Sequence, residues 1–224
     1  MLPPVHNVRF SSKIQVVSQA EFDRFNEPEL RRAGLSVDYP WDYKQRVPHA
    51  TEAITSDAQN CNAGGITNGL HLALFHINSI FSKWNPQPQH RDKNYTETME
   101  ALDDDISRLK KENPNLRALL TGGDRNNYNS PDLKAFLLGI FKYWSIPVSI
   151  LWGQREDIYP GSSVHYTCAN DTWSLCHCSG LQTASSLDDL KKAYEHIHID
   201  PGDQLVIAGQ EIPRALAEQE LNKP

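Results

Sequence analysis

The strongest restriction on the fold is the way in which short apolar segments alternate with longer amphipathic ones after residue 70. The segments 70–77, 116–121 and 146–152 have the length and the apolar content of buried β-strands. Between them, residues 95–109 place apolar side chains at alternating four- and three-residue steps, which is typical of an amphipathic helix. Because the segment 70–77 also fits one face of a helix, its periodicity leaves both assignments open.

The rest of the chain adds further strands and helices. Helices are predicted from Ser130 and from Ser186, since serine is a favoured residue at a helix N-terminus. Residues 164–168 and 172–178 flank a polar turn, which predicts a β-hairpin. A short strand at 205–208 and a C-terminal helix complete the pattern. Strands mixed with helices, including an antiparallel pair, predict an α+β fold built as a mixed α/β sandwich.

The domain organisation follows from length and composition. The chain has 224 residues, of which 39% are hydrophobic, so it can bury one substantial core. We expect the core domain over residues 50–210 and a C-terminal helix or tail over 211–224. Residues 1–49 are expected to form an irregular N-terminal extension packed on this core, although 16–32 has the pattern of a helix.

Charge and hydropathy exclude several classes of function. The formal net charge is -6, and the basic residues are spread along the chain without a run that could neutralise a row of phosphates. Nucleic acid is therefore not an expected partner. No segment approaches the roughly 18 apolar residues of a transmembrane helix, and the start of the sequence lacks the pattern of a Sec signal peptide.

The cysteines divide into one isolated residue, Cys61, and three late ones, Cys168, Cys176 and Cys178. They are too few and too clustered for a disulfide framework. The late three could be read with His177 as zinc ligands, but on a strand Cys176 and Cys178 point to one face and His177 to the other, whereas a structural zinc site usually takes pairs from a tight knuckle. We expect small buried residues in a hairpin there, and no metal.

Cys61 and two other residues could form a nucleophilic site. A thiol becomes a nucleophile when an imidazole removes its proton and a third group holds the imidazole in place. His76 lies at the end of the apolar segment after Cys61, and Thr55 lies shortly before it. The polar segment 55–60 is expected to be a turn whose backbone N–H groups form an oxyanion pocket. Each residue also has an ordinary reading, as a core thiol, a core histidine and a capping threonine.

The order Thr55, Cys61, His76 resembles the Thr-Cys-His arrangement of the CheD-type glutamine deamidases. Their fold is also similar to that of the catalytic domains of cytotoxic necrotizing factors and related deamidating toxins. The order of the later segments is similar as well, with a strand closing on Gly122-Gly123 and with Gly153-Gln154-Arg155 before paired strands. The resemblance covers roughly residues 50–178 and implies a CheD-like fold of mixed sheets flanked by helices.

The resemblance implies that the chain is a protein glutamine deamidase. Cys61 would attack the carboxamide of a substrate glutamine, backbone N–H groups of Asn60 and Cys61 would stabilise the oxyanion, and His76 would protonate the departing ammonia. Water would then hydrolyse the thioester to glutamate. Thr55 would orient His76, and the chemistry requires neither a metal nor an organic cofactor.

The resemblance also bears on partners and location. The substrate would be a target protein, either a host signalling protein or a chemoreceptor, and the enzyme would act in the cytoplasm or as an effector or toxin secreted into a host cell without a Sec signal. Gln59, Trp152 and Arg155 are candidates for contacts with the substrate.

Two other readings of the sequence remain open. Cys61 could open a helix and work with His165 as in papain-like proteases, although Gly64, Gly65 and Gly69 would each make that helix less stable by about 1 kcal/mol. The chain could also be a protein-binding module in which the thiol is inert.

Overall fold

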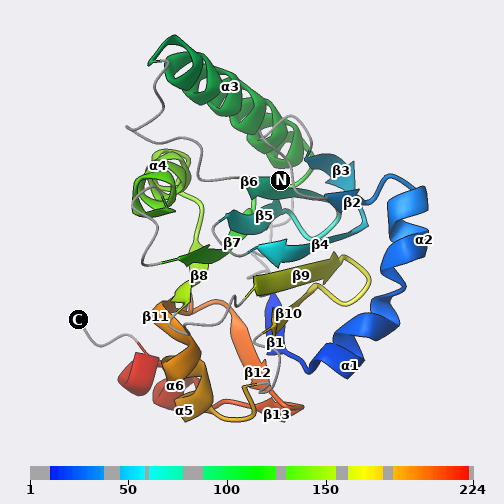
Figure 1. The fold of residues 1–224 in the computed structure, drawn as a ribbon, viewed down its shortest axis with the longest axis vertical. Helices are drawn as coiled ribbons and strands as arrows, with labels where there is room; N and C mark the ends of the chain where they lie inside the picture. Colours follow the sequence, from blue (N-terminus) through cyan, green and yellow to red (C-terminus); the bar gives the residue numbers. More distant parts are fainter. Residues whose placement is uncertain are drawn as a thin grey trace, which may run out of the picture.

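Two mixed β-sheets pack face to face, and helices cover their outer faces (Figure 1). The computed structural model describes residues 11–37, 46–58, 61–77, 88–124, 130–154, 161–178 and 184–221. This architecture confirms the predicted α+β class. Within these residues, no helix combines the length and the apolar character needed to span a lipid bilayer.

Among the residues that the structure describes, the first sheet has seven strands. In spatial order they are β13 (Gln210–Glu211), β12 (Gln204–Ile207), β1 (Lys13–Val16), β10 (Thr172–Cys178), β9 (Gly161–Thr167), β4 (Glu52–Ala58) and β2 (Ser36–Val37). The predicted hairpin is present as the antiparallel pair β9 and β10. Strand β1 runs parallel to both of its neighbours, β10 and β12. The N-terminal residues 13–16 are thus an integral strand of the sheet and not an addition to its surface.

In the described part of the chain, the second sheet has six strands. In spatial order they are β11 (Tyr194–His198), β8 (Val148–Gln154), β7 (Arg117–Asp124), β5 (Asn62–Thr67), β6 (Leu72–Ile77) and β3 (Val47–Ala50). Segment 72–77 is therefore a strand, which settles the ambiguity in its periodicity. All six of its residues are buried, because one face packs on the other sheet and the opposite face packs on helices. A strand buried on both faces lacks the regular alternation of polar and apolar residues that would reveal a two-residue period.

The helices form two outer layers. Helices α3 (Pro88–Glu112) and α4 (Ser130–Tyr143) pack on the second sheet around a cluster that includes Phe75, Leu102 and Phe141. On the outer face of the first sheet lie α1 (Gln19–Phe22), the 3₁₀ helix η1 (Asp23–Phe25) and α2 (Glu27–Arg32) (Figure 1). The single helix expected over 16–32 is divided in this way because β1 takes its first residue and Asn26 adopts a left-handed conformation.

Two helices lie beside the ends of the sheets. Helix α5 (Leu187–Ala193) begins after Ser186, whose side chain accepts a hydrogen bond from the backbone N–H of Asp189, as the sequence predicts. Helix α6 (Arg214–Leu221) is the C-terminal helix, and its buried Ala217 and Leu221 belong to the cluster between the sheets.

The neighbouring strands β5 and β7 of the second sheet approach closely at Gly64, whereas Gly139 on α4 has open space around it, so Gly→Ala substitutions at these two positions should have different outcomes. A Cβ at Gly64 would overlap the carbonyl oxygen of Leu119 on β7, so Gly64→Ala should destabilise the protein by about 3 kcal/mol or more. Gly139 lies exposed in the interior of α4 with open space around it, so Gly139→Ala should stabilise by about 0.5 to 1 kcal/mol.

Thermal unfolding of both variants measures this difference. For a chain of this size each kcal/mol shifts Tm by roughly 2 to 4 °C, so the two variants should move in opposite directions from the wild type. If Gly64→Ala were as stable as Gly139→Ala, the close approach of the paired strands β5 and β7 at Gly64 would be contradicted.

Candidate functional site

The candidate site lies in the layer between the two sheets, where β4 faces β5 and β6. Alternation along the strands directs the side chains of Leu72 and Leu74 into this layer, and His76 follows with the same parity. Thr55 lies on the opposite sheet, where its direct partner on β9 is Val164. Because Val164 belongs to the layer between the sheets and direct partners point to the same side, Thr55 points into this layer as well. Thr55 is 0% exposed and His76 is 1% exposed.

A hydrogen bond joins Thr55 to His76 across this layer. The Thr55 hydroxyl oxygen Oγ1 is 2.9 Å from Nδ1 of His76 and 3.0 Å from the backbone oxygen of Val37. A carbonyl oxygen can only accept, so the single hydroxyl hydrogen of Thr55 is donated to Val37. Thr55 Oγ1 must then accept from Nδ1–H of His76. In the neutral imidazole this places the proton on Nδ1 and leaves Nε2 as the basic nitrogen.

Cys61 lies on the same face of the second sheet as His76. Ala63 and His76 are direct partners on the antiparallel strands β5 and β6, and direct partners point to the same side. Cys61 precedes Ala63 by two residues, so it shares that side and lies diagonally across from His76. Both Cys61 and Ala63 belong to the cluster between the sheets, and Cys61 is 4% exposed. Diagonal neighbours of this kind are within reach of longer side chains such as histidine.

The backbone of Cys61 is held by the adjoining end of β7. The N–H of Gly123 donates to the carbonyl oxygen of Cys61 at 2.8 Å. Gly122 has a φ of 83°, and a Cβ at this position would overlap the same carbonyl oxygen. Glycine is therefore required there by both the conformation and the close approach. Strand β7 does not end before Gly122-Gly123, as the sequence suggests, but continues to Asp124.

Asn62, the residue after Cys61, is a support that the sequence analysis did not identify. It is fully buried, and its Oδ1 accepts a hydrogen bond of 2.8 Å from Nε1 of Trp152. The ammonium of Lys134 on α4 lies 3.9 Å from the centroid of the same indole ring. Trp152 is 4% exposed, and its indole supports the end of β5. The sequence around Trp152 gives no indication that its indole contacts Asn62 on β5.

The oxyanion turn expected over residues 55–60 differs from the structure. Residues 52–58 form strand β4, and Thr55 contributes to the site because it is a buried strand residue, not because it belongs to a turn. Asn60, Gln59 and Arg155 lie outside the described residues.

The structure does not bring His165 to Cys61. Its sequence neighbours Val164 and Tyr166 face the layer between the sheets, so His165 faces the opposite side of the first sheet. There its ring stacks on Phe25 with 3.9 Å between centroids, and its Nε2 is 2.8 Å from Oε1 of Glu52. Burial lowers the pKa of His165, against the opposing effect of Glu52. Cys61 also precedes a strand, whereas the papain-like reading requires a helix.

The late cysteines lie on different faces of the first sheet. Cys176 belongs to the outer cluster, and its thiol donates to Oε1 of Gln19 at 3.3 Å. Cys168 packs against the cluster between the sheets, where burial raises its pKa to about 11. His177 lies beside Tyr194, with 5.2 Å between ring centroids. The side chain of Cys178 lies outside the described part of the chain.

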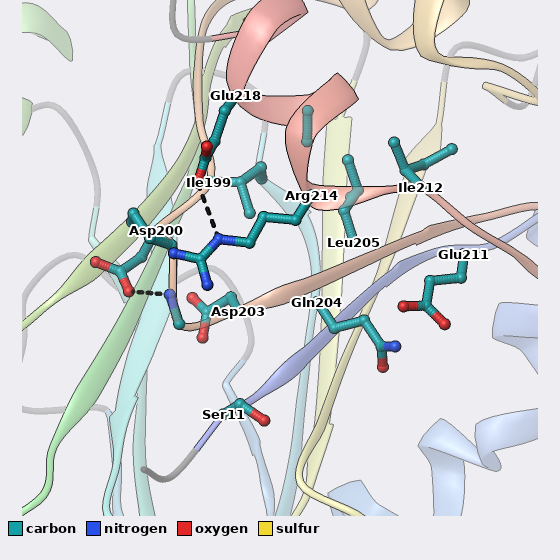
Figure 2. A pocket seen from close by; sticks show the side chains of 13 residues that line it. Ser11, Ile199, Asp200, Asp203, Gln204, Leu205, Glu211, Ile212, Arg214 and Glu218 are labelled. Atoms are coloured by element: carbon teal, nitrogen blue, oxygen red, sulfur yellow. Dashed lines mark hydrogen bonds and ion pairs between the residues drawn. The ribbon is translucent and has the colours of Figure 1, made fainter.

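A pocket of about 300 Å³ lies elsewhere, between the turn before β12 and helix α6 (Figure 2). Its charged groups are largely paired within the protein. Arg214 bonds Glu218 at 2.9 Å, and Asp200 and Asp203 both bond Arg117, at 2.8 and 3.0 Å. Burial raises the pKa of Asp203 to about 6. The residues that line this pocket do not include Thr55, Cys61 or His76, so it is separate from the thiol site.

Neither a protein-family model nor a curated protein matches the sequence.

The geometry predicts that the cysteines differ in reactivity. With a pKa of about 11, Cys168 has a thiolate fraction of only about 10⁻⁴ at pH 7. Cys61, with an imidazole on its own face of the sheet, should react with iodoacetamide at pH 7 at least about tenfold faster than Cys168. Peptide mapping after timed alkylation measures each rate, and urea-unfolded protein is the control for intrinsic reactivity.

The same experiment on His76→Ala tests the cause. The rate advantage of Cys61 should disappear, because the group that removes the thiol proton is absent. Equal rates for Cys61 and Cys168 in the folded wild type, or an advantage that survives in His76→Ala, would contradict this account of the site.

Proposed function

We propose that the protein is a cysteine-dependent protein glutamine deamidase that converts a glutamine of a target protein to glutamate. The observation that carries the proposal is the Thr55–His76 hydrogen bond, which leaves Nε2 of His76 as the basic nitrogen on the face of the sheet that holds Cys61. Nucleophile, base and orienting group are the three parts that thiol catalysis requires.

In the proposed reaction, His76 removes the proton of the Cys61 thiol, and the thiolate attacks the carboxamide carbon of the substrate. The tetrahedral intermediate collapses with cleavage of the carbon–nitrogen bond, and the imidazolium of His76 gives its proton to the departing ammonia. His76 then activates a water molecule that hydrolyses the thioester. The net change is one water consumed, one ammonia released and one glutamine converted to glutamate.

The surroundings of the site suit this chemistry. Cys61 and His76 are both almost completely buried, and interactions between charges are stronger in such surroundings than in water. A thiolate–imidazolium pair is therefore sensitive to how well the imidazole is oriented. Thr55 supplies this orientation and has its own position fixed by Val37. Backbone N–H groups near Asn60 and Cys61 are the proposed oxyanion donors.

The target class is taken from the resemblance to CheD-type and toxin deamidases. A host signalling protein or a chemoreceptor would present an exposed glutamine, and the enzyme would work in the cytoplasm or as a secreted effector. A binding module with an inert thiol is the competing non-enzymatic proposal, and activity measurements separate the two.

The proposal predicts a specific pattern of activity among variants. Cys61→Ser should abolish turnover, because a serine hydroxyl is much less acidic than a thiol. His76→Ala should reduce the rate by roughly 10² to 10⁴, the usual contribution of general acid–base catalysis. The assay combines ammonia release with quantitative mass spectrometry of glutamine-to-glutamate conversion in cell lysates incubated with each variant.

Matched controls keep the result interpretable. Thr55→Ser retains the hydroxyl and should keep most of the activity. Thr55→Val removes it and should cost about tenfold, the rate equivalent of one hydrogen bond of about 1.4 kcal/mol. His165→Ala should leave activity largely unchanged, because His165 lies on the outer face of the first sheet. Cleavage of peptide bonds in the target proteins would contradict the proposal. Glutamine-to-glutamate conversion that persists in Cys61→Ser would contradict it as well.

A further inference from the structure

A second group of side chains suited to chemistry converges at the opposite end of β6 from His76. His49 belongs to β3, His71 directly precedes β6, and Glu112 is the last residue of α3. The three residues are far apart in the sequence and come together only in the fold. They share no residue with the thiol site or with the pocket of Figure 2.

The potential ligand atoms of these residues are already close. Nε2 of His49 is 2.8 Å from Oε1 of Glu112, and Nδ1 of His71 is 2.8 Å from Oε2 of the same carboxylate. All of the ligand atoms lie within 4.8 Å of one another. The two imidazole rings stack with 3.9 Å between centroids and 27° between planes, and each has one nitrogen within hydrogen-bonding distance of the carboxylate.

Buried polar contacts hold two of the three residues in place. Asn68 is fully buried, and its Nδ2 donates to Oε2 of Glu112 at 3.1 Å and to the backbone oxygen of Leu109 at 2.8 Å. Its Oδ1 accepts from the backbone N–H of His71 at 2.8 Å. The side-chain amide of Asn68 therefore links two parts of the cluster: the turn that holds His71 and the end of the helix that holds Glu112. Supporting contacts of this kind orient the ligands of metal sites.

A separate contact holds the strand that carries His49. Nη2 of Arg108 on α3 donates to the backbone oxygen of Pro48 at 2.6 Å. Arg46, which directly precedes β3, pairs through its guanidinium with the buried carboxylate of Asp105 on α3. Strand β3 is thus tied to α3 next to His49, and the cluster rests on a prearranged framework.

We propose that His49 Nε2, His71 Nδ1 and the Glu112 carboxylate bind one divalent transition-metal ion, with Zn²⁺ the best match. Two imidazole nitrogens and one carboxylate are a common donor set for zinc, which also accepts a water as fourth ligand. With metal–ligand bonds of about 2.1 Å, tetrahedral ligand atoms lie about 3.4 Å apart. The observed atoms therefore need only small side-chain rotations. The imidazoles and the carboxylate are each about one-third exposed, so an ion can reach them from solvent.

Binding would replace the two direct histidine–carboxylate hydrogen bonds by bonds to the metal and would release any proton held on the ligating nitrogens. The ion would link β3, the turn before β6 and the end of α3. It would therefore clamp the edge of the second sheet to its covering helix and would act on stability, separately from the proposed reaction at Cys61.

Isothermal titration of the metal-free full chain with Zn²⁺ tests the proposal. The titrations use the Cys61→Ala background, because a thiol beside a histidine can bind zinc itself. One ion per chain should bind, and His49→Ala or His71→Ala should weaken the affinity by about 100-fold or more, at least the loss seen when a supporting residue is removed. His196→Gln, an exposed histidine on β11, is the matched control and should bind as the parent does.

Thermal unfolding gives a second readout that does not depend on how stable each variant is alone. Zn²⁺ at about 100 times its Kd should raise Tm of the parent and of His196→Gln by roughly 5 to 10 °C. It should leave His49→Ala and Glu112→Gln almost unchanged. Zinc binding that is equal in His49→Ala, His71→Ala and the parent, or the absence of stoichiometric binding in the parent, would overturn the proposal.

Discussion

The burial of Thr55 and His76 between the two sheets is the constraint on which the candidate site depends. A hydroxyl and an imidazole in a layer otherwise formed by Leu72, Leu74 and similar side chains are costly unless they bond to each other. Thr55 lies on β4 of the first sheet and His76 on β6 of the second, so their hydrogen bond forms only when the sheets pack in the observed register. The packing that stabilises the fold therefore also selects the tautomer of the imidazole.

The thiol is placed by a different set of forces. Cys61 stands at the start of β5, where its backbone bonds Gly123 and its neighbour Asn62 bonds Trp152. These contacts fix the strand end, while alternation along the strand directs the thiol to the His76 face. The site thus combines a cross-sheet hydrogen bond with a strand end held by glycines and a buried indole. It uses rigid strands, which position reacting groups more accurately than loops do.

The sequence predicts those features that depend on local patterns. The amphipathic helix around Leu102, the hairpin that ends at Cys178 and the cap at Ser186 follow from periodicity, from a turn signal and from capping chemistry. Residue type and order alone predict that Thr55 lies beside His76. The sequence does not predict that β1 lies between β10 and β12 and runs parallel to both. It also does not predict the contact of Trp152 with Asn62 or the convergence of two histidines on Glu112. Each joins segments far apart in the chain, and such pairings depend on the packing of the whole fold.

In the neutral form of His76, Thr55 holds the proton on Nδ1 and leaves Nε2 basic toward the face of Cys61. Long-range ¹H–¹⁵N correlation spectra of protein labelled at histidine report the tautomer of each ring, and a spectrum of His76→Gln assigns the His76 signals. We expect an Nδ1–H tautomer for His76 in the wild type and loss of this preference in Thr55→Val. A proton on Nε2 of His76 in the wild type, or an identical spectrum in Thr55→Val, would contradict it.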